Sequence, residues 1–335
     1  MLYKLKSSVF QMKITRSLKA FMGGIIDYAG LFPPAKLELE EAFGNYVKYK
    51  NGSLSEMISG FICPVKLLKQ LEIIILKNYR DENKINVTVL GRGGYDRDNF
   101  LQVLEEDLNY WSDFLLNTEN KVITESFEIK LPDELITAHD SKKLSVFINE
   151  ISAKIKNRIN QDVFIFFEGH IGTKWKKNIK HFIEAVKIHN ESENNCGYKL
   201  RTGGTEIDFF PEPEVIAYSI RECLDRNIRM KCTAGLHHPF RHYDINIGVK
   251  MHGFINVFGA GIIAMRHNIS DSGLKEIIDD ENPDNFVFTD ECFSWKDWKI
   301  SPEEIDFARK NLMISFGSCS FDEPLEDLVE LNLLQ

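Results

Sequence analysis

Residues 198–233 read YKLRTGGTEIDFFPEPEVIAYSIRECLDRNIRMKCT and contain one complete repeat of the pattern that decides the fold. A short stretch at 198–201, in which Tyr198 and Leu200 alternate with charged residues, is followed by an amphipathic segment at 214–227 and by a second short stretch at 229–233. Alternation of short strands with longer amphipathic segments is typical of parallel strands joined by helices. These residues therefore predict a strand–helix–strand unit.

The same pattern extends over the rest of the chain. The predicted strands are residues 22–27, 57–63, 86–90, 126–131, 163–168, 198–201, 229–233 and 285–289. Helical patterns between them cover residues 37–49, 65–79, 98–116, 141–158, 175–188, 214–227 and 245–265. An eighth helix is expected to start at Ser301-Pro302-Glu303-Glu304, where Ser is a good N-cap and Pro fits the first turn, and to end near residue 312.

Eight strand–helix repeats predict a closed (β/α)8 barrel, the TIM barrel, as a single α/β domain over residues 1–335. Residues 1–20 are then an N-terminal extension, and residues 313–335 are a C-terminal closing segment. An open, doubly wound parallel sheet is the alternative, because it produces the same alternation.

The composition excludes several classes of protein. The chain has 335 residues, 43% hydrophobic and 27% charged, with a net charge of -9 and no long basic run, which argues against a nucleic-acid partner. Its apolar runs are too short to span a membrane, and its first twenty residues do not resemble a secretory signal. The six cysteines form no C-x-x-C pair. We expect a cytoplasmic protein without a cofactor, and leave open whether copies associate into a homo-oligomer.

Charged residues mark the ends of the predicted strands. In a barrel, the active site lies at the carboxyl ends of the strands, and residues i and i+2 share a face. Charges facing the helices would be costly, so we expect the charged faces to turn inward. The residues that these rules bring together at the mouth are Lys199 with Arg201, Lys231 with Thr233, Glu128 with Lys130, and the strand-terminal Asp27 and Glu168.

The turn after strand six, Thr202-Gly203-Gly204, favours a binding site over a mere structural network. A buried ion-pair network that plugs one end of the barrel is the alternative. A plug does not need glycines directly after the lysine strand, whereas backbone N–H groups that approach an anion do need residues without side chains. We therefore expect this turn to contact an anionic substrate.

Further polar residues follow strand seven. His237, His238, Arg241, His252 and Asn256 lie on or near the same predicted rim and are candidates for substrate binding, with His238 as a candidate for proton transfer. Asp27, Glu168, His238 and His252 are the alternative ligands of a divalent metal, although no H-x-H or i, i+4 spacing specifies a metal site.

The cysteine in Phe316-Gly317-Ser318-Cys319-Ser320-Phe321 is interpreted as an inert thiol, and a nucleophile is the alternative. This segment is expected to come after the eighth helix and not after a strand. Nothing in the sequence pairs Cys319 with a base, which a reactive thiol requires. The acidic residues after it predict a short closing helix.

Two resemblances to known families involve these residues. Residues 26–35 (IDYAGLFPPA), 199–204 (KLRTGG), 233–239 (TAGLHHP) and 317–321 (GSCSF) resemble a family of uncharacterised bacterial proteins over nearly the whole chain. The pattern Lys199-x-x-Thr202-Gly203, followed by Lys231-x-x-x-Gly235, is similar to the strand-six and strand-seven signatures of deoxyribose-phosphate aldolases. That resemblance implies that the first lysine forms a Schiff base and the second lowers its pKa. Arg201, where the aldolases have a small residue, and Glu128 with Lys130, in place of their proton-shuttling aspartate, depart from that pattern.

Lysine chemistry at the barrel mouth is the functional hypothesis. Neighbouring positive charges lower the pKa of a lysine and so make its amine nucleophilic. We expect Lys199 to form an imine with a small anionic carbonyl metabolite, Lys231 to lower its pKa, Glu128 or Glu168 to act as acid and base, and Arg201 to bind the anion. The reaction is then a class I aldolase-like lyase or isomerase step. The alternatives are a divalent-metal-dependent hydrolase or isomerase of the same fold, and a non-catalytic protein that binds an anionic metabolite.

Overall fold

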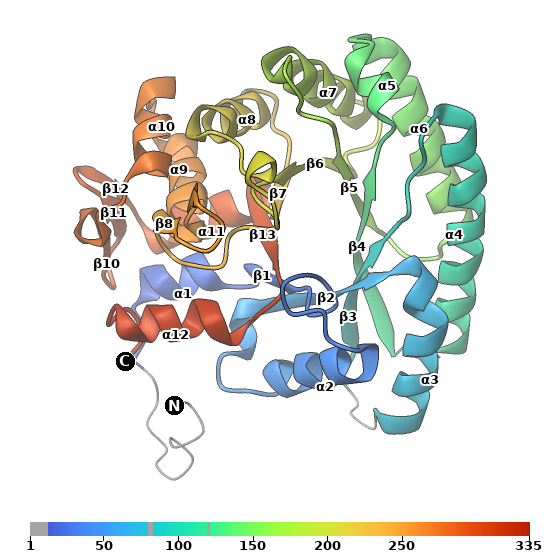
Figure 1. Ribbon diagram of the computed structural model, residues 1–335, viewed down its shortest axis with the longest axis horizontal. Helices are drawn as coiled ribbons and strands as arrows, with labels where there is room; N and C mark the ends of the chain where they lie inside the picture. The colour runs from blue at the N-terminus through green and yellow to red at the C-terminus, as the bar shows by residue number, and fades with distance from the viewer. Residues whose placement is uncertain (1–12, 80–82, 119–120) are drawn as a thin grey trace.

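A computed structural model describes residues 13–79, 83–118 and 121–335 of the chain. At its centre, eight parallel strands form a closed barrel in the spatial order β1-β13-β7-β6-β5-β4-β3-β2 (Figure 1). The closure confirms the predicted (β/α)8 barrel over the open sheet, because an open sheet would leave two unpaired edges. The barrel strands are β1 (Ile26–Tyr28), β2 (Ile58–Pro64), β3 (Ile85–Leu90), β4 (Val122–Lys130), β5 (Phe164–Glu168), β6 (Cys196–Arg201), β7 (Met230–Thr233) and β13 (Met313–Ser318).

Helices cover the outer face of the barrel (Figure 1). The helix predicted from Ser301 is confirmed: the Ser301 hydroxyl accepts a hydrogen bond from the Glu304 backbone N–H, and the Glu304 carboxylate accepts one from the Ser301 N–H. The helices are α1 (Arg16–Met22), α2 (Leu39–Lys50), α3 (Leu68–Asn78), α4 (Arg97–Asn117), α5 (Asp133–Thr137), α6 (Ser141–Arg158), α7 (Trp175–Asn190), α8 (Pro213–Asp225), α9 (Phe254–Arg266), α10 (Asp271–Asp279), α11 (Pro302–Asn311) and α12 (Asp322–Glu330).

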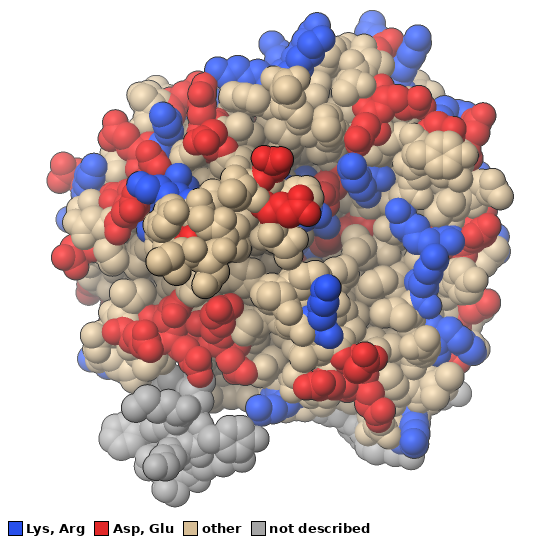
Figure 2. All heavy atoms as spheres, in the orientation of Figure 1, with Lys and Arg blue, Asp and Glu red and all other residues tan. Residues whose placement is uncertain are grey.

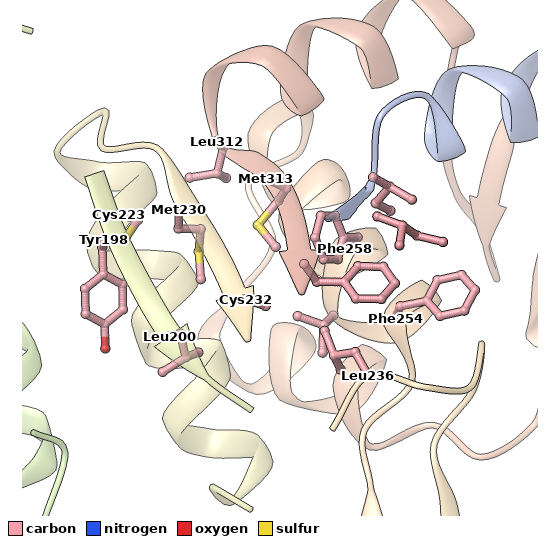
Figure 3. Packing of buried hydrophobic residues seen from close by; sticks show 14 of the residues in the cluster. Tyr198, Leu200, Cys223, Met230, Cys232, Leu236, Phe254, Phe258, Leu312 and Met313 are labelled. Atoms are coloured by element: carbon pink, nitrogen blue, oxygen red, sulfur yellow. The ribbon is translucent and has the colours of Figure 1, made fainter. Parts of the chain in front are cut away.

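Strand β6 shows why charged side chains turn into the barrel. Tyr198 and Leu200 belong to the apolar layer between the strands and the helices (Figure 3), and the Tyr198 ring meets Phe182 of α7 at 5.4 Å between centroids. Successive residues of a strand point to opposite faces, so Lys199 and Arg201 face the barrel interior. Burial of two apolar residues against the helices therefore fixes the direction of the two cations between them.

The eighth barrel strand is not the one predicted. Residues 285–289 contribute to β10 (Phe286–Phe288), which pairs antiparallel with β11 (Phe293–Trp295); β12 (Trp298–Ile300) completes this small sheet outside the barrel. The strand that closes the barrel is β13, between β1 and β7. Its sequence, MISFGS, is short and ends in small residues, so it carries a weaker apolar signal than the aromatic-rich hairpin before it. The predicted closing segment, 313–335, thus begins with a barrel strand and continues into α12.

The connection between β7 and β13 contains further differences from the prediction. The helix expected at residues 245–265 starts only at Phe254, and a hairpin of β8 (His242–Asp244) and β9 (Val249–Met251) precedes it. Residues 1–12 lie outside the described residues. They are part of the predicted N-terminal extension and of the twenty residues that do not resemble a secretory signal. Among the helices of the described ranges, none is long and apolar enough to cross a membrane.

Candidate active site

The barrel opens at the carboxyl ends of its strands into a cavity of about 370 Å³, within the size range of small-molecule sites. Figure 2 shows a hollow near the centre of this face, with acidic and basic side chains beside it. Its apolar lining includes Phe32, Pro33 and Pro34 after β1 and Phe209 after β6. The polar and charged residues that line it are Glu128, Lys130, Glu168, Lys199, Arg201, Thr205, Thr233, His237 and Cys319, with Gly91, Gly204, Gly235 and Gly317 between them.

Carboxylates and cations alternate along one continuous row from the barrel interior to the rim. The exposed fraction of the side chains is 6% or less from Asp27 to Lys199, 12% at Glu168 and 40% at Arg201. One end of the row is therefore buried and the other is open to solvent. The row runs Asp27, Lys231, Glu128, Lys199, Glu168 and Arg201, with successive N–O distances of 2.8, 2.7, 2.8, 3.3 and 3.1 Å.

Hydrogen bonds complete the sealed end of the row. Asp27 accepts the Ser315 hydroxyl at 2.5 Å and the Gly60 backbone N–H at 3.3 Å, and Lys231 donates to the Ser126 hydroxyl at 3.2 Å. We expected Lys231 beside Lys199 at the open mouth. It is level with Lys199 in the strand register, but it lines a separate cavity toward the amino ends of the strands. Buried charges are stable only when paired in this way, so Asp27 and Lys231 support the site from below.

The predicted lowering of the Lys199 pKa is wrong. Burial alone would lower it, but the adjacent Glu128 and Glu168 carboxylates outweigh burial and raise the pKa of Lys199 above its usual value. In turn, although burial opposes it, the cations lower the pKa values of both carboxylates. The prediction treats Lys231 and Arg201 as like charges next to Lys199. In the structure a carboxylate lies between Lys199 and each of these cations. In this state Lys199 is an ammonium group.

The glycines at the rim let two loops approach one another. A Cβ atom on Gly203 would lie 2.6 Å from the Gly235 Cα, and Gly235 has a φ of +77°. The Thr202 hydroxyl donates to the Ala234 carbonyl at 2.6 Å and holds the same two loops together. Gly204 and Gly235 line the cavity, while Thr202 and Gly203 do not. The glycines thus serve loop packing as well as space for a ligand.

The two adjacent histidines have different surroundings. His237 lines the cavity, and its Nδ1 atom lies 3.3 Å from Glu323 and 3.9 Å from the Cys319 sulfur. His238, the predicted proton-transfer residue, is absent from the cavity lining and pairs with Asp327 at 2.6 Å. Figure 2 shows that acidic side chains gather over α12, the helix that supplies both carboxylates. His237 is therefore the histidine that is placed to meet a ligand.

Arg241, His252 and Asn256 lie together, but they do not line the cavity. The Asn256 amide accepts from the Arg241 backbone N–H at 2.9 Å, and His252 contacts both the Arg241 guanidinium at 2.9 Å and the Pro211 carbonyl at 2.7 Å. Burial, reinforced by the Arg241 charge, lowers the pKa of His252 to about 4. These residues form a polar support beneath the β8–β9 hairpin.

The four residues of the alternative metal set do not converge. Asp27 is committed to Lys231 and Ser315, and Glu168 to Lys199 and Arg201. His238 and His252 have the separate partners described above. Within residues 13–79, 83–118 and 121–335, no group of three or more His, Cys, Asp or Glu side chains is arranged to hold a metal ion.

Sequence reasoning missed the part of the site that comes from β13. Cys319 lines the cavity directly after this strand, and Ser315, within it, binds Asp27. The signal in the sequence is the string GSCSF at the end of β13, and the stronger apolar pattern of residues 285–289 masks it. No protein-family model and no curated protein matches this chain. Its function therefore has to be argued from the geometry above.

Proposed function

We propose that this protein is an enzyme that forms a Schiff base between Lys199 and the carbonyl group of a small anionic compound, and that a lyase or isomerase step follows. The position of Lys199 carries the proposal. Its ammonium group lines the cavity, 2.8 Å from Glu128 and 3.3 Å from Glu168. An amine attacks a carbonyl only after it has lost its proton, and a carboxylate within one hydrogen bond can take that proton.

Glu168 is the better base of the two carboxylates. Glu128 is bound by both Lys199 and Lys231 and is 2% exposed, so its negative charge is held firmly. Glu168 is bound by Lys199 and by Arg201, and the Arg201 side chain reaches solvent at the rim. Only the second of these arrangements can change when a ligand enters.

An anionic substrate would itself prepare the nucleophile. A carboxylate or phosphate that binds Arg201 competes with Glu168 for the guanidinium and adds a negative charge nearby. Both effects raise the pKa of Glu168, so that it can accept the proton of Lys199. This coupling explains how a lysine that is protonated in the empty site becomes a nucleophile, and it selects carbonyl compounds that also carry an anionic group.

The proposed step balances in protons and electrons. Lys199 gives one proton to Glu168, and its lone pair forms the N–C bond while the carbonyl π-electrons move to oxygen. Glu168 returns the proton to that oxygen, takes a second proton from nitrogen, and delivers it to the hydroxyl group, which leaves as water. The resulting iminium ion accepts the electron pair of an adjacent C–H bond, whose proton passes to the Glu168 carboxylate, which is the isomerase step. In the lyase step it accepts the electron pair of an adjacent C–C bond, and the other fragment leaves as a second carbonyl compound after its hydroxyl group has given its proton to Glu168.

A non-catalytic protein that binds an anionic metabolite is the second candidate. The raised pKa of Lys199 favours it, because a fully paired ammonium group binds an anion without attacking it. Such a protein is stabilised by its ligand but forms no covalent adduct.

Borohydride trapping separates the two candidates. The protein is incubated with glyoxylate, pyruvate or glycolaldehyde phosphate and sodium borohydride, and the modified lysine is identified by peptide mass spectrometry. We expect an adduct on Lys199 that is lost in Lys199→Met and retained in Lys142→Met, a surface control on α6. Thermal stabilisation without an adduct supports the binding protein, and an adduct that survives Lys199→Met refutes the role of Lys199.

A further inference from the structure

A cysteine, a histidine and a glutamate lie close together at the edge of the cavity. Cys319 follows β13, His237 follows β7, and Glu323 lies in the first turn of α12. The His237 Nδ1 atom is 3.9 Å from the Cys319 sulfur and 3.3 Å from a Glu323 carboxylate oxygen. Both contacts involve Nδ1, so the Nδ1–H of a protonated His237 is shared between the sulfur and the carboxylate. A nucleophile within reach of an imidazole that a carboxylate holds in place is a starting point for covalent catalysis.

We propose that Cys319 and His237, oriented by Glu323, form a second nucleophilic centre in this cavity, which adds to the carbonyl carbon of an aldehyde ligand. The centre is separate from the lysine row: none of its three residues bonds to a member of that row in the contacts described above. The proposal therefore goes beyond the imine chemistry of Lys199 and does not depend on it.

Cys319 differs from the other cysteines of the described chain in its surroundings. Cys63, Cys196, Cys223 and Cys232 are buried in the core, where burial raises the pKa of each thiol and makes it inert. Cys292 is partly exposed, but its sulfur accepts only the Thr289 hydroxyl. Cys319 alone among these residues both lines the cavity and has an imidazole partner.

The charges around His237 favour its protonated, imidazolium form. Burial alone would lower the pKa of His237, but the hydrogen bonds and charges of Cys319 and Glu323 raise it to about 9. A protonated His237 stabilises the negative charge of a thiolate. Among the described residues, the other titratable groups near these three are the Tyr28 phenol on β1, which interacts with Cys319, and His238, which interacts with Glu323 and pairs with Asp327 of α12.

The addition needs no oxidant or further reactant. The Cys319 thiolate forms the S–C bond with the aldehyde carbon while the carbonyl π-electrons move to oxygen. That oxygen takes a proton from the His237 imidazolium, which gives a neutral hemithioacetal and a neutral imidazole. In the reverse direction His237 recovers the proton, so the adduct forms and breaks without net change.

The experiment measures alkylation of each cysteine by iodoacetamide between pH 6 and 8.5, with peptide mass spectrometry. In the wild type we expect Cys319 to react at pH 6 at least tenfold faster than in His237→Asn, because an unassisted thiol with a pKa of about 8.5 is almost entirely protonated there. Glu323→Gln should fall between the two, while Glu326→Gln, an exposed control on α12, should match the wild type. Cys292 reports in every sample on whether the fold is intact.

Glyoxylate, a small anionic aldehyde, tests the ligand class. We expect it to slow Cys319 alkylation in Lys199→Met as well as in the wild type, because the hemithioacetal protects the sulfur. Equal Cys319 rates in the wild type and His237→Asn, with an unchanged Cys292 rate, would overturn the nucleophilic centre. Absence of protection in Lys199→Met would overturn the aldehyde assignment. Since borohydride trapping reports on Lys199 alone, failure of either proposal is visible without the other.

Discussion

Lys199 and Lys231 are the same residue type at the same level of neighbouring strands, yet they lie in different environments. Both are buried, and both bind the Glu128 carboxylate, at 2.8 and 2.7 Å. The second partner of Lys231 is Asp27, sealed in the barrel, whereas that of Lys199 is Glu168, which continues to the exposed Arg201. The comparison shows that the second carboxylate bound by each lysine sets its role. A lysine whose second carboxylate is buried stabilises the fold, and one whose second carboxylate continues to an exposed cation can meet a ligand.

The largest effect is expected at Lys231. Lys231→Met leaves Asp27 without a cation in a sealed interior, and removal of one member of a buried pair costs about 3–5 kcal/mol of unfolding free energy. Urea denaturation followed by circular dichroism measures it. The double variant Lys231→Met, Asp27→Asn should recover part of the loss, and a cost below about 1 kcal/mol for the single variant would contradict this structural role.

The next effect is the loss of unfolding free energy at acidic pH, and it depends on Glu128. Its pKa is lowered from 4.5 to about 2, so its contribution is fully present above the unfolded pKa and is lost as the pH falls through that window. At roughly 1.4 kcal/mol per pKa unit, this amounts to about 3 kcal/mol. The difference in unfolding free energy between wild type and Glu128→Gln should therefore shrink from pH 6 to pH 3. A difference that stays constant over this range would show that Glu128 is not held ionised by its lysines.

A smaller loss of stability is expected at Lys199. In Lys199→Met, Glu128 keeps Lys231 and Glu168 keeps Arg201, so each carboxylate still has a cation. We expect a cost of about 2 kcal/mol, typical of hydrogen bonds to charged groups, in the same urea measurement. The comparison between the two lysines fails if Lys199→Met costs as much as Lys231→Met.

The smallest effect on stability is expected at the rim. Arg201→Met removes an ion pair whose arginine is 40% exposed, and such pairs contribute less than about 1 kcal/mol. Its effect on ligand capture should be larger: borohydride trapping of glyoxylate at Lys199 should fall by about tenfold, because the anion loses its guanidinium partner. Unchanged trapping would show that Arg201 does not bind the substrate, and its only effect would then be the small loss of stability.

Alternation along strands predicted most of the lysine row from the sequence. Lys199 and Arg201 are two residues apart on β6 and alternate with Tyr198 and Leu200. Because side chains alternate between the two faces of a strand, the two cations share the interior face and the other two residues share the face toward the helices. The same rule brought Glu128 to the interior. Position along a strand is a local property, and a local pattern is enough to predict it.

Pairing between strands could not be predicted in the same way. The sequence shows two lysines at equivalent levels but does not show that the Glu128 carboxylate lies between them, and this reverses the direction of the Lys199 pKa shift. Cys319 and His237 likewise meet only because β13 and β7 are neighbours. Contacts of this kind depend on which strand closes the barrel, and an aromatic hairpin concealed that strand.

The hydrogen bond between Asp27 and Ser315 joins residues that are 288 positions apart in the chain. A ribosome synthesises Ser315 288 residues after Asp27, so the deepest carboxylate of the row acquires this partner only after the strands between them have been made. Strand β13 thus completes the hydrogen bonds of the lysine row, and the cavity can bind a ligand only once the barrel has closed.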